Sequence, residues 1–413
     1  QSGFGRTGTV DWCTTAKTSP FTAVSGNGYF VNTTSGTVTV TLPASPSAGD
    51  IVAIQDYANT SSCNKITVGR NSSKIDGGCI DASIVTNGES FTLVYVDSTE
   101  GWKTVNNANK QINTVLFVTA TGGTVSTCGD FKIHTFTSSD NFVVSCAGNP
   151  GGSDTVDYLV VAGGGAGSNQ TSVSNNFLSG GGGGGGYRES SGAASGSYTR
   201  SPLGACVAAL PVTAQTYPVT VGGGAASGSL NGTPSVFSTI TSTGGGSGGA
   251  NPTPGVPGDG QPGGSGGGGF YGSRPGGSGN TPPVSPAQGT NGGTGAGPTT
   301  NGGGGGGGAT VAGANASSGA GAGGAGATSE ITNSPVVRAG GGGGGSGSGG
   351  TGGAAGSGGG GAGGSGQTPN PTHGAAGTVN TGGGAGGSSD YSVSGTAASA
   401  GGSGIVVIRY KFQ

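Results

Sequence analysis

The sequence predicts an all-β N-terminal domain joined to a glycine-rich bundle of polyglycine II helices, with essentially no α-helix. Apolar and polar side chains alternate along the first hundred residues with the period of two that is typical of strands. No segment shows the 3.6-residue apolar period of an amphipathic helix. Glycine supplies about 85 of the last 257 residues (103 in the chain less 18 before Val156), and such a composition cannot build an ordinary apolar core.

The N-terminal domain is predicted to span residues 1–112. The stretch GTVTVTLP places Val38, Val40 and Leu42 on one face of a half-buried strand. Clusters of Pro, Gly, Asn and Ser, which favour turns, separate it from the strands that follow. Those strands are expected at 50–57, 64–70, 90–97 and 101–105.

Residues 113–156 are predicted to form a β-hairpin connector, with strands around TVLFVTA, FKIHTFT and FVVSC. His134 in KIHTF is interpreted as a strand residue. The glycine-rich domain is assigned to residues 157–413. The apolar segment Tyr158–Val161 enters it, and a strongly β-forming strand, 404–412, closes it. These two segments are expected to pair.

The glycine runs recur at spacings near 20 or 40 residues, which indicates one traverse or one out-and-back excursion per repeat. A flexible linker is the usual state of Gly/Ser-rich sequence. Collagen is excluded because uninterrupted runs such as Gly302–Gly308 break the required three-residue frame. Polyglycine II helices are the ordered alternative that we predict: without Cβ atoms, extended three-fold helices approach closely enough to exchange backbone hydrogen bonds. Occasional Ala, Ser or Thr residues are expected at outward-facing positions.

Six cysteines in a chain with few charges favour disulfides in an extracellular protein. Cys128 and Cys146 flank one predicted hairpin, and Cys63 and Cys79 bracket a short stretch, so these are the predicted pairs. The pairing of Cys13 and Cys206 stays open. No C-x-x-C motif occurs, and the chain has only two histidines, so we expect no metal site.

The composition also narrows the function. Charged residues make up 7% of the chain and the net charge is -2, which argues against a nucleic-acid partner. No run of 18 apolar residues exists to span a membrane. Acid and base residues are scattered, so we expect no catalytic residues, no cofactor and no enzymatic activity.

The residues between the glycine runs include aromatic and cationic side chains, which are the candidate contact residues. One interpretation is that the rings only cover the ends of the bundle. The other is a contact surface for sugar or protein, where aromatic rings stack and Arg forms bidentate hydrogen bonds. The candidates are Phe177, Leu178, Tyr187, Arg188, Phe270, Tyr271, Arg274, His373 and Tyr391, with the Phe270–Tyr271 loop as first choice.

Several longer strings resemble parts of known proteins. LPASPSAGDIVAIQDYANT, KITVGRNSSKIDG, FTLVYVD and GWKTV resemble a β module of virion fibre proteins from tailed phages, especially those of marine and cyanobacterial hosts. VDYLVVAGGGAG, the glycine-rich body and the terminal GGSGIVVIRY are similar to the glycine-rich domain of phage tail-fibre and adhesin proteins. Together the strings cover nearly the whole chain.

The resemblance implies a homotrimeric fibre or its tip at the virion surface or in the extracellular space. Its partners would be other copies of the chain, other virion proteins, and a host surface polysaccharide or outer-membrane protein. Known adhesins of this type build polyglycine II sandwiches, and the family offers no catalytic residues. The alternative that we keep is a secreted microbial structural filament or extracellular matrix protein.

Overall fold

The structure, a computed structural model, describes most of the chain and divides it into two compact units. Unit 1 comprises Gln1–Val118 and Cys146–Asp154, and unit 2 comprises Thr119–Ser145 and Thr155–Gln413. The predicted fold class is confirmed: the described residues form strands and glycine-rich segments, with only two short 3-10 turns. The described residues are 10–105, 117–148, 152–168, 178–196, 198–204, 207–226, 228, 230–251, 258–297, 301–347, 349–367, 372–389 and 399–413.

Unit 1 holds two sheets, and from β1 to β6 the chain crosses between them after every strand. Strands that are neighbours in one sheet therefore run parallel, as in a short solenoid, whereas β7 to β9 join by antiparallel pairing. One sheet contains β1 (Asp11–Lys17), β3 (Asn27–Val31), β5 (Ile51–Asp56), β8 (Ser90–Asp97) and β9 (Gly101–Val105). The other contains β2 (Phe21–Thr22), β4 (Val38–Thr41), β6 (Ile66–Gly69) and β7 (Ala82–Ile84).

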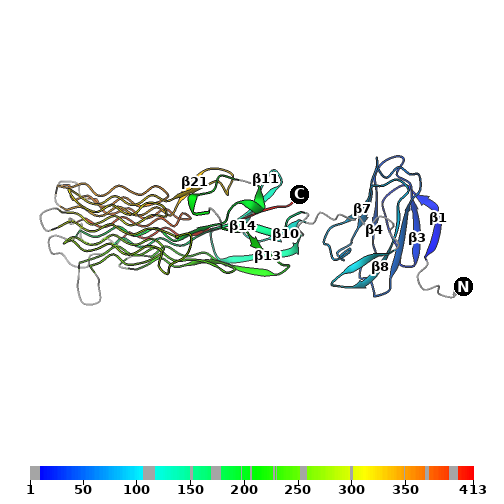
Figure 1. The fold of residues 1–413 in the computed structure, drawn as a ribbon, viewed down its shortest axis with the longest axis horizontal. Helices are drawn as coiled ribbons and strands as arrows, with labels where there is room; N and C mark the ends of the chain where they lie inside the picture. Colours follow the sequence, from blue (N-terminus) through cyan, green and yellow to red (C-terminus); the bar gives the residue numbers. More distant parts are fainter. Residues whose placement is uncertain are drawn as a thin grey trace. The chain divides into compact units, whose positions relative to one another are not determined.

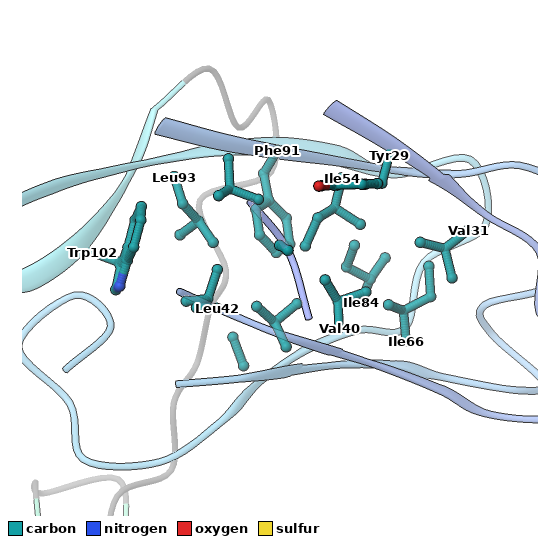
Figure 2. Packing of buried hydrophobic residues seen from close by; sticks show 14 of the residues in the cluster. Tyr29, Val31, Val40, Leu42, Ile54, Ile66, Ile84, Phe91, Leu93 and Trp102 are labelled. Atoms are coloured by element: carbon teal, nitrogen blue, oxygen red, sulfur yellow. The ribbon is translucent and has the colours of Figure 1, made fainter. Parts of the chain in front are cut away.

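The facing sides of these sheets form an apolar core. Figure 2 shows the side chains of both sheets meeting in one layer, with Trp102 at one end of it and Val31 at the other. Val40, Leu42 and Leu93 are completely buried, as the alternating pattern predicts. Each such side chain contributes about 1.5–3 kcal/mol by leaving water, so this unit is stabilised in the ordinary way.

The predicted disulfides are wrong. Cys128 lies at the end of β11 (Thr124–Cys128), where its thiol hydrogen-bonds to Asn333 Oδ1 over 2.9 Å, so it does not reach Cys146. Cys63 carries a free, exposed thiol, so no bridge joins it to Cys79. Burial, together with the adjacent Cys146 thiol, instead raises the pKa of Cys79 to about 11. Spacing along the chain did not predict that Cys79 and Cys146 are neighbours. Cys206 lies outside the described residues.

Unit 2 begins as two sheets. One has the order β10 (Val118–Thr121), β13 (Asp140–Ala147), β17 (Thr216–Thr220), β18 (Ser235–Phe237) and β19 (Ile240–Ser242). The other has the order β11, β12 (Phe131–Phe136), β22 (Ile405–Lys411), β14 (Thr155–Val161) and β15 (Tyr187–Glu189), with β16 (Leu210–Pro211) also paired to β14. β14 and β22 are antiparallel with Tyr158 opposite Ile408, which confirms the predicted pairing.

The glycine-rich segments leave these sheets and run side by side along unit 2, away from the end that holds β10, β13 and β14 (Figure 1). Gly180–Gly186 shows their conformation. The N–H groups of Gly181 and Gly184 donate to Gly304 and Gly307, at 3.0 and 2.9 Å. The acceptor segment thus recurs after three residues, which is the repeat of polyglycine II.

The other residues of Gly180–Gly186 also donate to the same neighbouring segment at every third position. Gly182 and Gly185 donate to one segment, and Gly183 and Gly186 donate to another, at 2.7–2.8 Å. Three further segments donate back to its carbonyl groups at 2.8–3.1 Å. One helix is therefore enclosed by six others. The acceptor segments are 304–307, 382–385 and 243–246, and the donor segments are 265–268, 342–345 and 162–165.

Amide side chains extend this lattice where a backbone neighbour is missing. Asn231 accepts from Ser247 N at 2.9 Å and donates to Pro262 O at 3.0 Å, which are the bonds of a peptide group. Gln288 accepts from Thr243 N and donates to Pro282 O. Because primary amides carry the same donor and acceptor as the backbone, they complete the pairing that buried polar groups need.

Small side chains lie both at the perimeter of the lattice and inside it, where Ala166, Ala385 and Ser265 are fully buried. An added Cβ inside the lattice would meet backbone atoms of the next helix. At Gly184 it would lie 2.5 Å from Ala339 O, whereas at the exposed Gly223 the nearest atom is Thr233 Oγ1 at 3.8 Å. The exposed alanines of the perimeter include Ala226, Ala312, Ala314, Ala354, Ala355, Ala362, Ala375 and Ala376.

Gly184→Ala is expected to destabilise unit 2 by about 3 kcal/mol, because the backbone of the neighbouring helix cannot move aside. Gly223→Ala, the matched control, should be neutral or stabilising by about 0.5 kcal/mol, since it restricts the unfolded chain only. Hydrogen exchange of peptides from residues 178–187 measures the effect. Equal protection in the two variants would contradict the lattice.

His134 lies in β12, as predicted, within an aromatic cluster between the sheets. It is fully buried and stacks on Tyr410, with ring centroids 5.5 Å apart. Nδ1 lies 2.7 Å from Gly122 O and therefore carries the proton, so Nε2 accepts from the Tyr410 hydroxyl at 3.0 Å. Burial, together with Lys132, lowers the pKa of His134 although the Gly122 carbonyl opposes the shift.

The contribution of His134 to the free energy of unfolding of unit 2 should therefore fall as the pH drops below about 6.5. There the unfolded chain protonates at His134 while the folded chain does not, and the loss levels off below the folded pKa. Each unit of pKa difference corresponds to about 1.4 kcal/mol. Calorimetry measures the melting temperature between about pH 5 and about pH 8, the range in which histidines titrate. The melting temperature should show a step downward as the pH falls, both in wild type and in the control His373→Gln. A step of equal size in His134→Gln would contradict the assignment.

Candidate functional site

The turn Phe270–Arg274 lies at the end of the glycine bundle that is remote from the sheets. Its position follows from Tyr271 N, which donates to Leu178 O at 3.2 Å, since Leu178 begins the helix whose other end adjoins β15. Gly272 and Ser273 reverse the chain with φ of 90° and 62°, and both of their N–H groups donate to Ala296 O at 2.8 Å. The glycine is needed here because its φ is positive.

Arg274 and Asp259 carry the charge at this turn. Arg274 Nη1 lies 3.5 Å from Asp259 Oδ1, and each side chain is about half exposed (47% and 50%). An exposed pair of this kind adds about 0.2–1 kcal/mol at most. Arg274 and Asp259 can therefore separate at little cost in free energy, and each can then bind an external hydrogen-bonding partner.

The other candidate residues are spread over the unit. Leu178, Tyr187 and Phe270 are buried, and these rings and the leucine pack the bundle ends, so they are not presented to a partner. Phe270 and Tyr271 meet edge to face at 6.3 Å. Tyr271 is half-buried and Arg274 exposed.

Arg188 lies in β15, at the sheet end of the bundle and away from the turn. His373 is exposed near the remote end, on a segment tied to Ser365 through Thr372. Phe177 and Tyr391 lie outside the described residues.

Two buried carboxylates that the sequence reasoning missed organise the sheet end. Asp157 accepts four hydrogen bonds, from Ser190 Oγ (2.6 Å), Gly192 N (3.0 Å), Ser195 N (2.8 Å) and Ser195 Oγ (2.6 Å). These bonds hold the turn η1 (Ala193–Ser195) against β14. The carboxylate is saturated with donors and fully buried, so its role is structural.

Glu189 is held in the same manner by hydroxyl groups of Tyr187, Ser201 and Ser329, at 2.5–3.0 Å. Burial raises the pKa of Glu189, although the bonds from Ser201 and Ser329 oppose the shift. Burial likewise lowers the pKa of Arg338, and Tyr187 and Glu189 oppose that change. The negative charge of Glu189 thus favours the charged form of Arg338 in this interior.

No group of three or more His, Cys, Asp or Glu side chains converges to hold a metal within the described ranges. Nor is any helix there long and apolar enough to cross a membrane.

The glycine-rich domain family matches residues 137–411, about two thirds of the chain. The chain therefore belongs to the glycine-rich domain family. No curated protein matches it. The matched range includes β14, β22 and all of the polyglycine II segments between them.

Asp157→Asn is expected to destabilise unit 2 by about 3 kcal/mol, because the new amide N–H groups face four donors. Asp259→Asn makes the same chemical change at the exposed pair and should cost less than about 0.5 kcal/mol. Calorimetric melting of both variants measures the difference. Similar melting temperatures would show that the Asp157 network is not what fixes the turn.

Proposed function

We propose that this chain is a non-enzymatic fibre or adhesin component of a phage virion that binds the host cell surface through the remote end of its glycine-rich unit. The observation that carries the proposal is the contrast between the lattice and its ends. Inside the lattice a side chain clashes with neighbouring backbone, so distinctive side chains gather at turns. At the turn 270–274 the half-buried Tyr271 and the exposed Arg274 are presented together.

The chemistry of this turn suits a cell-surface ligand. A tyrosine ring packs on apolar faces of a sugar or side chain and keeps a polar tip, while the guanidinium of Arg274 donates in a planar fork. The partner class is a host surface polysaccharide or an outer-membrane protein. Within a virion the chain would form a homotrimer and contact other virion proteins.

The perimeter of the bundle favours a discrete unit over the alternative, a secreted structural filament. Lateral growth of a polyglycine lattice needs bare helices at its edge. Exposed alanines such as Ala354 and Ala375 occupy some of these positions, and their Cβ atoms keep another helix at a distance, as charged residues do at sheet edges.

Adsorption to bacteria tests the proposal. Labelled full-length chain is offered to a panel of marine bacteria and cyanobacteria, in wild-type form and as Tyr271→Ser with Arg274→Ala. We expect the double variant to lose adsorption about tenfold or more, because contact residues of these types dominate binding. Val379→Ser, which changes an exposed residue (67%) near the sheet end, is the control and should adsorb normally.

Treating the cells with periodate or with protease separates a sugar receptor from a protein receptor. Equal adsorption of the double variant and wild type would overturn the assignment of the turn. Formation of open polymers by the purified chain, without adsorption to any cell, would favour the filament.

A further inference from the structure

A row of three aromatic rings crosses the outer face of the five-stranded sheet of unit 1, far in sequence from the turn discussed above. Trp12 in β1 packs against Phe30 in β3, with ring centroids 4.9 Å apart and planes inclined by 34°. Phe30 meets Tyr57, just after β5, edge to face at 6.3 Å. We call Trp12, Phe30 and Tyr57 the aromatic row.

Strand register places these rings on the face away from the core. Tyr29 and Val31, which flank Phe30 in β3, point into the core (Figure 2). Successive side chains of a strand alternate, so Phe30 faces outward. Trp12 is opposite Gly28 on the same outer face, and Tyr57 follows the buried Asp56 and is held by its N–H bond to Val31 O, 2.9 Å.

The row is exposed although the core does not need it. Trp12 is 43% exposed and Tyr57 is 56% exposed, whereas Trp102, the other tryptophan of the chain, is completely buried. A fold driven by burial alone has no reason to leave two large rings in water on one face. The row therefore resembles a surface kept for a ligand more than a part of the packing.

Gly28 fixes how the indole is presented. A Cβ on Gly28 would lie 2.7 Å from Trp12 Cδ2 and 2.8 Å from Cε3, so the ring rests directly on the strand backbone. The indole is thereby held against the strand backbone while Trp12 stays 43% exposed. Covering a strand glycine with an aromatic ring also stabilises the sheet, but that role needs no contribution from Tyr57.

The surroundings of the row are polar but carry little charge. Gln55 lies on the same face and donates to Asp56 O and Gly88 O, at 3.0 and 3.1 Å. Asn32, the next outward position after Phe30, accepts from Thr34. Lys17 lies over Phe21, at 5.6 Å from its ring centroid. Aromatic faces bordered by amides and hydroxyls suit a ligand with apolar C–H faces and hydroxyl edges, and the scarcity of charge suits a neutral one.

We infer that the aromatic row is a second binding surface, which takes a neutral polysaccharide by packing the C–H faces of its pyranose rings on Trp12, Phe30 and Tyr57. The exposed length of the row, spread over β1, β3 and the end of β5, fits an extended chain of sugars better than a single one. This inference does not depend on the function proposed for the turn 270–274.

The test uses the full chain in affinity electrophoresis through gels that contain a neutral β-glucan, mannan, galactan or starch. At least one of these polysaccharides should retard the wild type. Tyr57→Ala and Trp12→Ala should each weaken the binding about tenfold, as truncation of stacked aromatic residues does. Val85→Ala, which removes an exposed apolar side chain elsewhere on unit 1, should bind normally.

Trp12 also supplies a direct signal, because Trp102 is shielded from solvent. Polysaccharide should protect the wild-type fluorescence from acrylamide quenching, and Trp12→Ala should lose this effect. The variant Tyr271→Ser with Arg274→Ala should behave as wild type here, so failure of this inference is distinct from failure of the proposed function. The inference is overturned if none of the four polysaccharides retards the chain, if Trp12→Ala and Tyr57→Ala bind like wild type, or if sedimentation shows that the row instead joins two copies of the chain.

Discussion

Backbone hydrogen bonds between helices that carry no side chains are the constraint on which the glycine-rich unit depends. In Gly180–Gly186 each residue donates its N–H to a neighbouring segment, and the carbonyl groups of Gly181–Gly184 and Gly186 accept from other segments. The direction of donation turns by a third of a circle at each step. Most peptide groups of this run are then paired without a sheet or an α-helix. The same contacts require helix spacings that a Cβ would prevent, so composition and architecture follow from one condition.

The two units thus reach an ordered state by different physical routes. Unit 1 removes apolar side chains such as Leu93 and Trp102 from water between two sheets. The glycine lattice has almost no such side chains, and ordering glycine costs more conformational entropy than ordering other residues. Its compensation is extensive backbone hydrogen bonding, close packing and weak Cα–H···O contacts. The antiparallel pair β14 and β22 ties both ends of this long excursion together and sets its starting register.

Much of the fold could be predicted from the sequence because its patterns are local. The strand predicted at 90–97 has the bounds of β8, and the strand at 101–105 those of β9. The pattern of alternation says which face is buried but not which strand lies alongside, so the crossing between sheets in unit 1 was not foreseen. Cysteine pairing failed for the same reason, since Cys79 and Cys146 are distant in sequence.

The candidate site was predicted less well, because the function of an aromatic residue beside a glycine run depends on how the runs pack. Tyr187 follows seven consecutive glycines and was taken as a contact residue, yet it is buried against Glu189. Asp157 lies in the apolar string VDYLVV, and no pattern in the sequence predicts the four hydrogen bonds that its carboxylate accepts. The turn that holds Arg274 stands out in the sequence because its Phe-Tyr pair interrupts the glycine pattern, and its contact role stays a prediction.

The sparse apolar interior of the lattice has a thermal consequence. The heat capacity change of unfolding comes mainly from hydrating newly exposed hydrocarbon, and peptide groups contribute with the opposite sign. A body built from paired peptide groups and glycine methylenes such as Gly302–Gly308 exposes little hydrocarbon when it melts. Its free energy of unfolding therefore changes little with temperature. Cooling destabilises it far less than it destabilises a protein that depends on an apolar core.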